Sequence, residues 1–213
     1  MPNYWLHFIG QKYYTRQAFI KEAMAYGASR RVSLADLKKM AWDDVVLCAM
    51  YEGKKSVLFG MFKITRLSGL TKEATAVLEK FFGLEKIDNG GLSIRRGCGE
   101  YITGPEYRIN ATLAEIAEVL DALKRQGVDI GKPLIGGPFA QHKPVVRLAS
   151  IPHRQGFRLF DYQAFQVALQ RATGKKVPVV RGQFYVSTAP GKGPREGAVQ
   201  EVQDYQLRAT GAA

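Results

Sequence analysis

The feature that most constrains this fold is a pair of adjacent apolar stretches in the N-terminal half of the chain. Residues 45–50 read Val-Val-Leu-Cys-Ala-Met, and residues 56–64 return as a second apolar stretch after a polar turn of Glu-Gly-Lys-Lys. Because alternate residues of a strand face opposite sides, this hairpin is apolar on both of its faces. Two such strands need cover on both faces, which predicts a barrel or a sheet beneath helices.

Helices are predicted on both sides of this hairpin, each with its own start and stop signals. A hydroxyl side chain caps a helix by accepting a hydrogen bond from the first turn, and glycine tolerates the left-handed backbone past its end. The predicted N-caps are Thr15, Ser33, Thr71 and Thr112, and the predicted end positions are Gly27, Gly83 and Gly127. Helices and strands alternate without a regular βαβ rhythm, which predicts an α+β fold.

Five further segments are assigned from their glycines, prolines and apolar residues. The turn at 88–91, Asp-Asn-Gly-Gly, predicts a hairpin of residues 85–87 with residues 92–96. Residues 128–144 are interpreted as an extended connection, and residues 27–31 as a basic turn. Towards the C-terminus we expect a helix opened by Asp161 and a strand over residues 177–186.

The charge of the chain points to a polyanionic partner. Thirty-one Lys and Arg against nineteen Asp and Glu give a net charge of +12 and a pI near 9.7. An excess of this size attracts nucleic acid through counterion release and a long-range field. The alternative is a basic protein without a nucleic-acid role. With two cysteines, no signal pattern and no long apolar run, we expect a soluble protein of the cytoplasm that does not enter a membrane.

Several motifs of the N-terminal third together resemble the PUA-like β-barrels, in particular their EVE and ASCH branches. The resemblance covers residues 3–67 and lies in the order of its parts. These are the strand Tyr4-Trp5-Leu6, the turn Ser29-Arg30-Arg31, the helix Leu37-Lys38-Lys39-Met40, the entry Asp43-Asp44 and the strand Val57–Ile64. It implies a PUA-like barrel with flanking helices in residues 1–83. We expect residues 84–186 to form an α/β extension packed on the barrel, either as a separate domain or as one continuous domain with it. Residues 187–213, in which Gly, Pro, Gln, Ala and charged residues prevail, predict a flexible tail.

The resemblance also implies a site, because such a barrel would recognise nucleic acid and hold an altered or flipped base in an aromatic pocket. Base-stacking candidates are Trp5, Tyr13, Tyr14 and Trp42, and phosphate-contacting candidates are Arg30 and Arg31. Core packing is the competing interpretation of the tryptophans, above all of Trp5 on an apolar strand.

Two other basic segments add candidate contacts. Arg95 and Arg96 precede Gly-Cys-Gly, where exposed amides beside arginines suit an anion, although a plain glycine turn explains the same residues. Arg154 and Arg158 interleave with phenylalanines, which suits a single strand or a flipped base. The alternative is a loop whose phenylalanines anchor it to the core.

We therefore expect a nucleic-acid-binding protein, DNA or RNA, that uses no metal and no organic cofactor. The three histidines show no ligand spacing with the cysteines, and no nucleophile or paired-acid motif is present. Two alternatives stay open. One is a small interaction or inhibitor protein that docks on a nucleic-acid enzyme. The other is an ASCH-type modifying enzyme, for which the candidate acids are Glu100, Glu106, Asp43 and Asp44, with Glu100 and Asp43 the ones to test.

Overall fold

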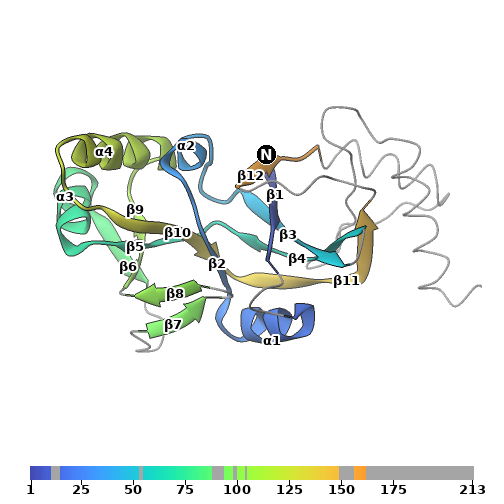
Figure 1. Cartoon of the computed structure of the whole chain (residues 1–213). Coiled ribbons are helices and arrows are strands. Elements are labelled where there is room, and N and C mark those ends of the chain that lie inside the picture. The colour runs from blue at the N-terminus through green and yellow to red at the C-terminus, as the bar shows by residue number, and fades with distance from the viewer. Residues whose placement is uncertain are drawn as a thin grey trace, which may run out of the picture. The chain divides into compact units, whose positions relative to one another are not determined.

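A computed structural model shows that the chain folds into an α+β protein of helices and strands (Figure 1). It describes residues 1–10, 15–52, 55–87, 94–97, 100–103, 105–148 and 156–161. The chain forms two compact units, each assembled from separate stretches. Residues 1–3, 21–45 and 62–139 form the first unit, and residues 4–20, 46–61 and the described residues from 140 onward form the second.

The first unit is built on a five-stranded sheet of order β2-β10-β5-β9-β6. Its strands are β2 (Ala28–Arg31), β10 (Gly131–Gly137), β5 (Arg66–Leu70), β9 (Glu106–Ile109) and β6 (Leu84–Ile87). Every neighbouring pair in this sheet is antiparallel. A separate antiparallel hairpin of β7 (Ile94–Gly97) and β8 (Glu100–Thr103) lies next to β2 and β5.

Three helices complete the first unit, α2 (Leu34–Leu37), α3 (Lys72–Phe82) and α4 (Leu113–Arg125). Their predicted caps are confirmed. The Oγ atoms of Ser33, Thr71 and Thr112 accept hydrogen bonds from Asp36, Ala74 and Glu115, and Thr112 with Glu115 forms a complete capping box. Figure 1 shows α2, α3 and α4 on the side of the unit away from β7 and β8. The buried faces of these helices include Leu37, Leu78 and Leu120.

The second unit contains most of a sheet of order β11-β4-β3-β1-β12. Its strands are β11 (Phe139–Leu148), β4 (Lys55–Lys63), β3 (Val45–Glu52), β1 (Tyr4–Phe8) and β12 (Phe157–Leu159). The hairpin predicted from the two apolar stretches is β3 and β4, near the middle of the sheet. Leu47 and Cys48 are fully buried, as cover on both faces requires. In the part of the chain that the structure describes, neither large sheet closes into a barrel.

Helix α1 (Arg16–Tyr26) begins where the sequence predicts. The Oγ1 of Thr15 accepts a hydrogen bond from the amide of Ala18 at 3.2 Å. Gly27 follows the helix with a φ of 78°, a conformation that glycine adopts without steric cost. In the second unit, Phe19 packs edge-on against Phe59 with ring centroids 5.3 Å apart.

Three local predictions are wrong. Residues 27–31 contain a strand, β2, and residues 85–87 pair with β9 in place of residues 92–96. Residues 131–137 are the strand next to β2 and β5, not a connection. A Cβ at Gly136 would lie 2.8 Å from the Ala28 carbonyl oxygen, and one at Gly137 would overlap the Lys63 carbonyl oxygen. The glycines permit close strand packing here, so they do not mark a loop.

Pro133 can belong to this strand because the pairing of the strand is irregular at that position. The register between β10 and β5 shifts between Gly131 and Leu134, and the carbonyl of Pro133 accepts a hydrogen bond from Val32 at 3.0 Å. The predicted helix at Asp161, the strand at 177–186 and the tail at 187–213 fall mostly or wholly outside the described residues.

Candidate nucleic-acid interface

The loop between α2 and β3 is fixed by the carboxylate of Asp44. This side chain is 1% exposed, and its oxygens accept from the amides of Asn3 at 2.8 Å and Ala41 at 3.0 Å. Two backbone bonds then join the loop to the end of β4, from Asp43 N to Ile64 O at 2.9 Å and from Ile64 N to Asp44 O at 2.8 Å. Residues 41–44 are therefore held rigidly. This fixes the backbone that carries the side chains of Trp42 and Asp43.

Trp42 is half-buried on this loop and has two specific contacts. Its indole Nε1 donates to the carbonyl of Ala111, directly before the N-cap of α4, at 2.7 Å. The guanidinium of Arg108, from β9, lies over the ring at 5.2 Å from the centroid, a cation–π contact. Trp42 thus fixes the position of a cation at the surface of the first unit.

Asp43 lies between two cations. Its Oδ1 is 3.2 Å from Lys63 Nζ and its Oδ2 is 3.4 Å from Arg108 Nη2, with the three side chains 47%, 53% and 38% exposed. The hydrogen bond from Lys63 and the nearby charges lower the pKa of Asp43 below its ordinary value. Its φ is 71°, a left-handed conformation that Asp tolerates better than most residues. We call Trp42, Asp43, Lys63 and Arg108 the Trp42 cluster.

The structure places the predicted site residues in different environments. Trp5 is 3% exposed on β1, so it packs in the core as its competing interpretation requires. Arg30 is 5% exposed on β2, whereas its neighbour Arg31 is exposed. Arg158 is half-buried on β12 in the second unit. Tyr13, Tyr14 and Arg154 lie outside the described residues, as do the side chains of Arg95 and Arg96.

Of the candidates for base stacking, Trp42 is the one whose described environment includes exposed charge. Sequence reasoning missed the two partners that make it a site, Lys63 and Arg108. Lys63 ends an apolar strand and Arg108 belongs to a four-residue strand, so neither stands out locally. One local signal for this site is present in the sequence. Trp42 comes directly before Asp43 and Asp44, whose carboxylates need hydrogen-bond donors or cations nearby.

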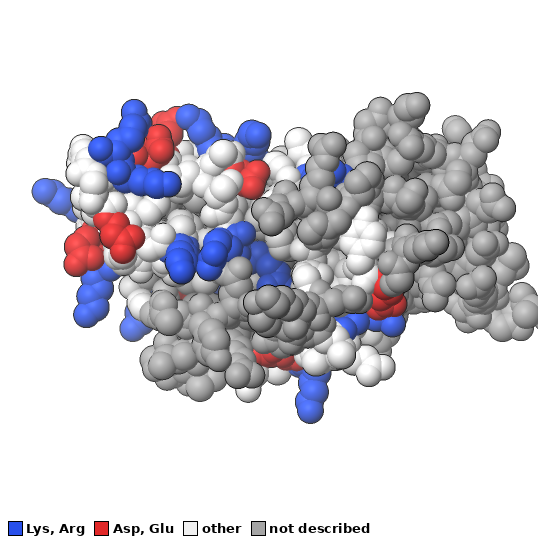
Figure 2. All heavy atoms as spheres, in the orientation of Figure 1, with Lys and Arg blue, Asp and Glu red and all other residues white. Residues whose placement is uncertain are grey.

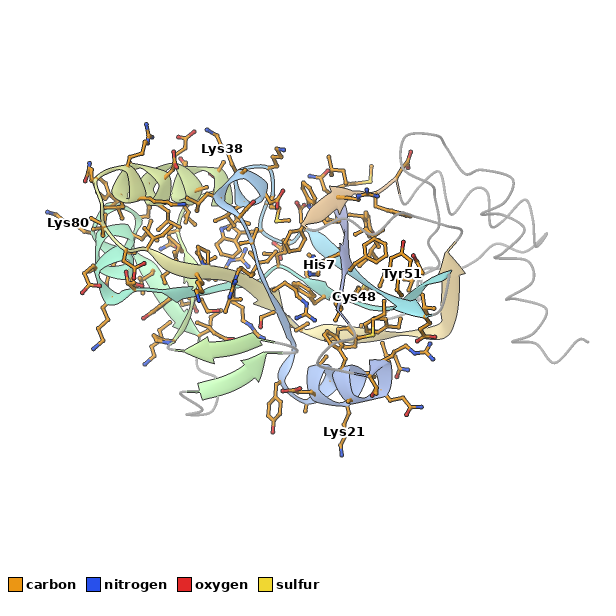
Figure 3. The ribbon with its side chains drawn as sticks, in the orientation of Figure 1. His7, Lys21, Lys38, Cys48, Tyr51 and Lys80 are labelled. Carbon is orange, nitrogen blue, oxygen red and sulfur yellow. The ribbon has the colours of Figure 1, made fainter. Side chains whose placement is uncertain are left out.

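The described acids are largely engaged, and many lysines are not. Ion pairs or hydrogen bonds use Asp36, Asp43, Asp44, Glu52, Glu106, Glu115, Glu118, Asp121 and Asp129. Within the same described ranges, exposed lysines without an ion pair are Lys21, Lys39, Lys72, Lys80, Lys86, Lys124 and Lys132. Figure 3 shows Lys21 and Lys80 pointing away from their helices. Exposed Glu73, Glu79 and Glu85 likewise make no ion pair within these ranges, so the described surface carries only a small excess of unpaired positive charge.

Figure 2 shows where basic side chains gather on the face in view. Over α2 and α4 they alternate with acidic side chains. Over β2 and β10 a group of basic side chains has no acidic one within it, and these two strands carry the exposed Arg31 and Lys132. This group suits an anionic ligand better than the mixed surface of the helices does.

Glu106, one of the acids named above for the enzyme alternative, is buried in the first unit. Its Oε1 is 3.1 Å from Arg66 Nε, with side chains 1% and 10% exposed, and Arg66 Nη2 donates to the Tyr26 carbonyl at 3.1 Å. A Cβ at Gly27 would come within 2.7 Å of that Nη2, so the glycine makes room for the guanidinium. No group of three or more metal-ligating side chains occurs among the described residues.

None of the described helices combines the length and apolar character needed to cross a membrane. Comparisons of the chain with protein-family models, with curated proteins and with solved structures gave no match.

Proposed function

We propose that this protein binds nucleic acid, mainly by contacting the phosphates of the nucleic-acid backbone, and that it holds a base at the Trp42 cluster. The observation that carries the proposal is the net positive charge of the sequence. The net charge is +12, and exposed lysines without ion pairs spread over the described part of the chain. In addition, Asp161 is the one acid between residues 130 and 195, where Lys and Arg recur throughout. Phosphate contacts by such residues supply most non-specific affinity for nucleic acid.

The Trp42 cluster supports single strands as the ligand. Bases of single strands stack on aromatic rings and on the planes of arginine guanidinium groups. Arg108 is held over Trp42 and is partly exposed, so its outer plane is a suitable surface for a base. Lys63 lies nearby for a flanking phosphate. The resemblance of residues 3–67 to PUA-like domains suggested this function, and the proposal keeps it although neither described sheet closes into a barrel. The proposal fits the cytoplasmic location expected from the sequence and requires no metal or cofactor.

The test is fluorescence anisotropy of labelled single- and double-stranded DNA and RNA across a range of salt. We expect affinity to fall steeply with salt, and single strands to bind more tightly than duplexes. Substituting both Lys63→Met and Arg108→Met should weaken binding and reduce the salt slope by about 0.7 for each lost phosphate contact. Lys38→Met is the matched control, since Lys38 is already paired with Glu118 at 2.9 Å.

A second candidate function is docking on an acidic protein partner, and exposed apolar side chains favour it. In the first unit, Phe81 is 68% exposed, Met24 57% and Tyr26 45%. An inhibitor of a nucleic-acid enzyme would use such side chains beside its basic surface. If no oligonucleotide binds even at low salt, the nucleic-acid proposal fails. Salt-resistant capture of a protein partner, lost in Phe81→Ser, would then support this second function.

A further inference from the structure

We propose that Asp43 is a built-in competitor for nucleic acid: its carboxylate lies where a backbone phosphate binds, and a bound strand replaces it at Lys63 and Arg108. This inference rests on the proposed function and assigns a phosphate-binding position to the Trp42 cluster. It also assigns the cluster a closed state, in which Asp43 bridges the cations, and an open state, in which a phosphodiester does.

The geometry of Asp43 resembles that of a bound phosphodiester. Each of its two oxygens contacts a different cation, Oδ1 with Lys63 at 3.2 Å and Oδ2 with Arg108 at 3.4 Å. A phosphodiester also presents two charged oxygens, and lysine and arginine bind both groups through the same donors. The two cations therefore form a two-point anion site that Asp43 occupies.

The bridge is of a kind that a ligand can displace. Charge-assisted bonds typically span about 2.7–2.9 Å, and both contacts of Asp43 are longer than that. The three side chains are 38–53% exposed, and exposed ion pairs contribute little because water and salt screen them. The buried pair of Arg66 with Glu106 in the same unit has no such access to water.

The rest of the cluster keeps its place when Asp43 leaves. Arg108 is held over the Trp42 ring at 5.2 Å, and Trp42 is fixed by its bond to Ala111 at 2.7 Å. The loop backbone is fixed by Asp44 and by the bond from Asp43 N to Ile64 O, not by the Asp43 side chain. The left-handed φ of 71° at Asp43, the one such non-glycine residue among those described, directs that side chain between the cations.

Asp43→Asn tests the inference, because asparagine keeps the size of the side chain and tolerates the same backbone. The control is Asp121→Asn, which removes one carboxylate from an exposed pair with Arg125 at 3.3 Å and changes the net charge equally. Anisotropy with a labelled single-stranded oligonucleotide is the measurement. We expect Asp43→Asn to tighten binding by about 3- to 10-fold, because the strand no longer displaces a carboxylate from the two exposed contacts with Lys63 and Arg108. Asp121→Asn should change it by less than about twofold.

The gain must depend on the two cations. In a Lys63→Met/Arg108→Met background, Asp43→Asn should change affinity no more than Asp121→Asn does. If Asp43→Asn and Asp121→Asn are equal in the natural background, the inference is overturned while the proposed function stands. A gain that persists without the two cations also overturns it, because net charge alone then explains the effect. If no variant binds any strand, both proposals fail.

A second variant guards against misfolding. Asp43→Gly removes the carboxylate and also the steric cost of the positive φ, so it should fold at least as well as Asp43→Asn. Both variants should bind more tightly than the natural chain. The NMR signal of Arg108 Nε should shift on addition of strand in each of them, and an unchanged signal would overturn the assignment of this position.

Discussion

The guanidinium of Arg66 and the carboxylate of Glu106 form a buried ion pair on neighbouring strands of the first unit, with Nε 3.1 Å from Oε1. Arg66 also donates to the carbonyl of Tyr26. The pair differs in kind from the exposed contacts of Asp43, because neither partner can turn to water. Burying two charges costs free energy that only a close partner offsets. This pair therefore fixes how β5 and β9 pack, whereas the exposed contacts can exchange.

Glu106→Gln should destabilise the fold severely. It leaves the buried charge of Arg66 without its anion, and breaking a buried pair in this way costs about 3–5 kcal/mol. Urea unfolding followed by circular dichroism measures the change. Glu118→Gln is the control, since its pair with Lys38 is exposed on both sides and is worth at most about 1 kcal/mol. Equal effects of the two substitutions would show that the buried pair does not form in solution.

The parts of the fold that sequence alone predicts are those specified by neighbouring residues. The caps at Ser33, Thr71 and Thr112 depend on groups three residues away, and the β3–β4 hairpin depends on adjacent apolar runs. Strand pairing depends on distant residues. The turn at 88–91 predicts a hairpin for β6, yet β6 pairs with β9, whose partner β5 lies earlier in the chain.

The Trp42 cluster could not be predicted from the sequence, because it too depends on contacts between residues far apart in the chain. Its members come from the loop before β3, the end of β4 and the middle of β9, so no spacing relates residues 42, 63 and 108. Burial is equally non-local. Arg30 and Arg31 are adjacent and basic, but Arg30 is buried like Ala28 and Ser29 before it, whereas Arg31, the last residue of β2, is exposed.

Gly137→Ala should destabilise the first unit strongly. The added Cβ would overlap the backbone carbonyl of Lys63, and a backbone atom cannot turn aside as a side chain can. Overpacking of this kind costs about 1–3 kcal/mol or more. Gly10→Ala is the control, because nothing lies within 4 Å of its Cβ position. Thermal unfolding of both variants is the measurement, and a neutral Gly137→Ala would contradict the close approach of β10 to the end of β4.

Trp42→Phe should cost about 1–3 kcal/mol, because it leaves the Ala111 carbonyl without the donor that now lies 2.7 Å away. Arg108→Met keeps that hydrogen bond. It removes the cation–π contact, worth about 0.5–1 kcal/mol at a partly exposed site, and the exposed pair with Asp43, worth at most about 1 kcal/mol. Urea unfolding should therefore rank Trp42→Phe as the more destabilising of the two. The reverse order would mean that the indole is held by Arg108 and not by Ala111.

The pKa of Asp43 should lie below its ordinary value of 3.8, mainly because Lys63 donates a hydrogen bond to the carboxylate. Because the pKa of Asp43 is lower in the folded state than in the unfolded state, its ionised carboxylate stabilises the fold at any pH above the unfolded-state pKa. This stabilisation is lost as the pH falls through the folded-state pKa. NMR titration of the carboxyl carbon measures it. Lys63→Met should raise the pKa of Asp43 more than Arg108→Met does, and Lys38→Met should leave it unchanged. If Asp43 titrates at or above 3.8 in the natural chain, the bridge is absent in solution and Asp43 cannot act as the competitor of a bound phosphate.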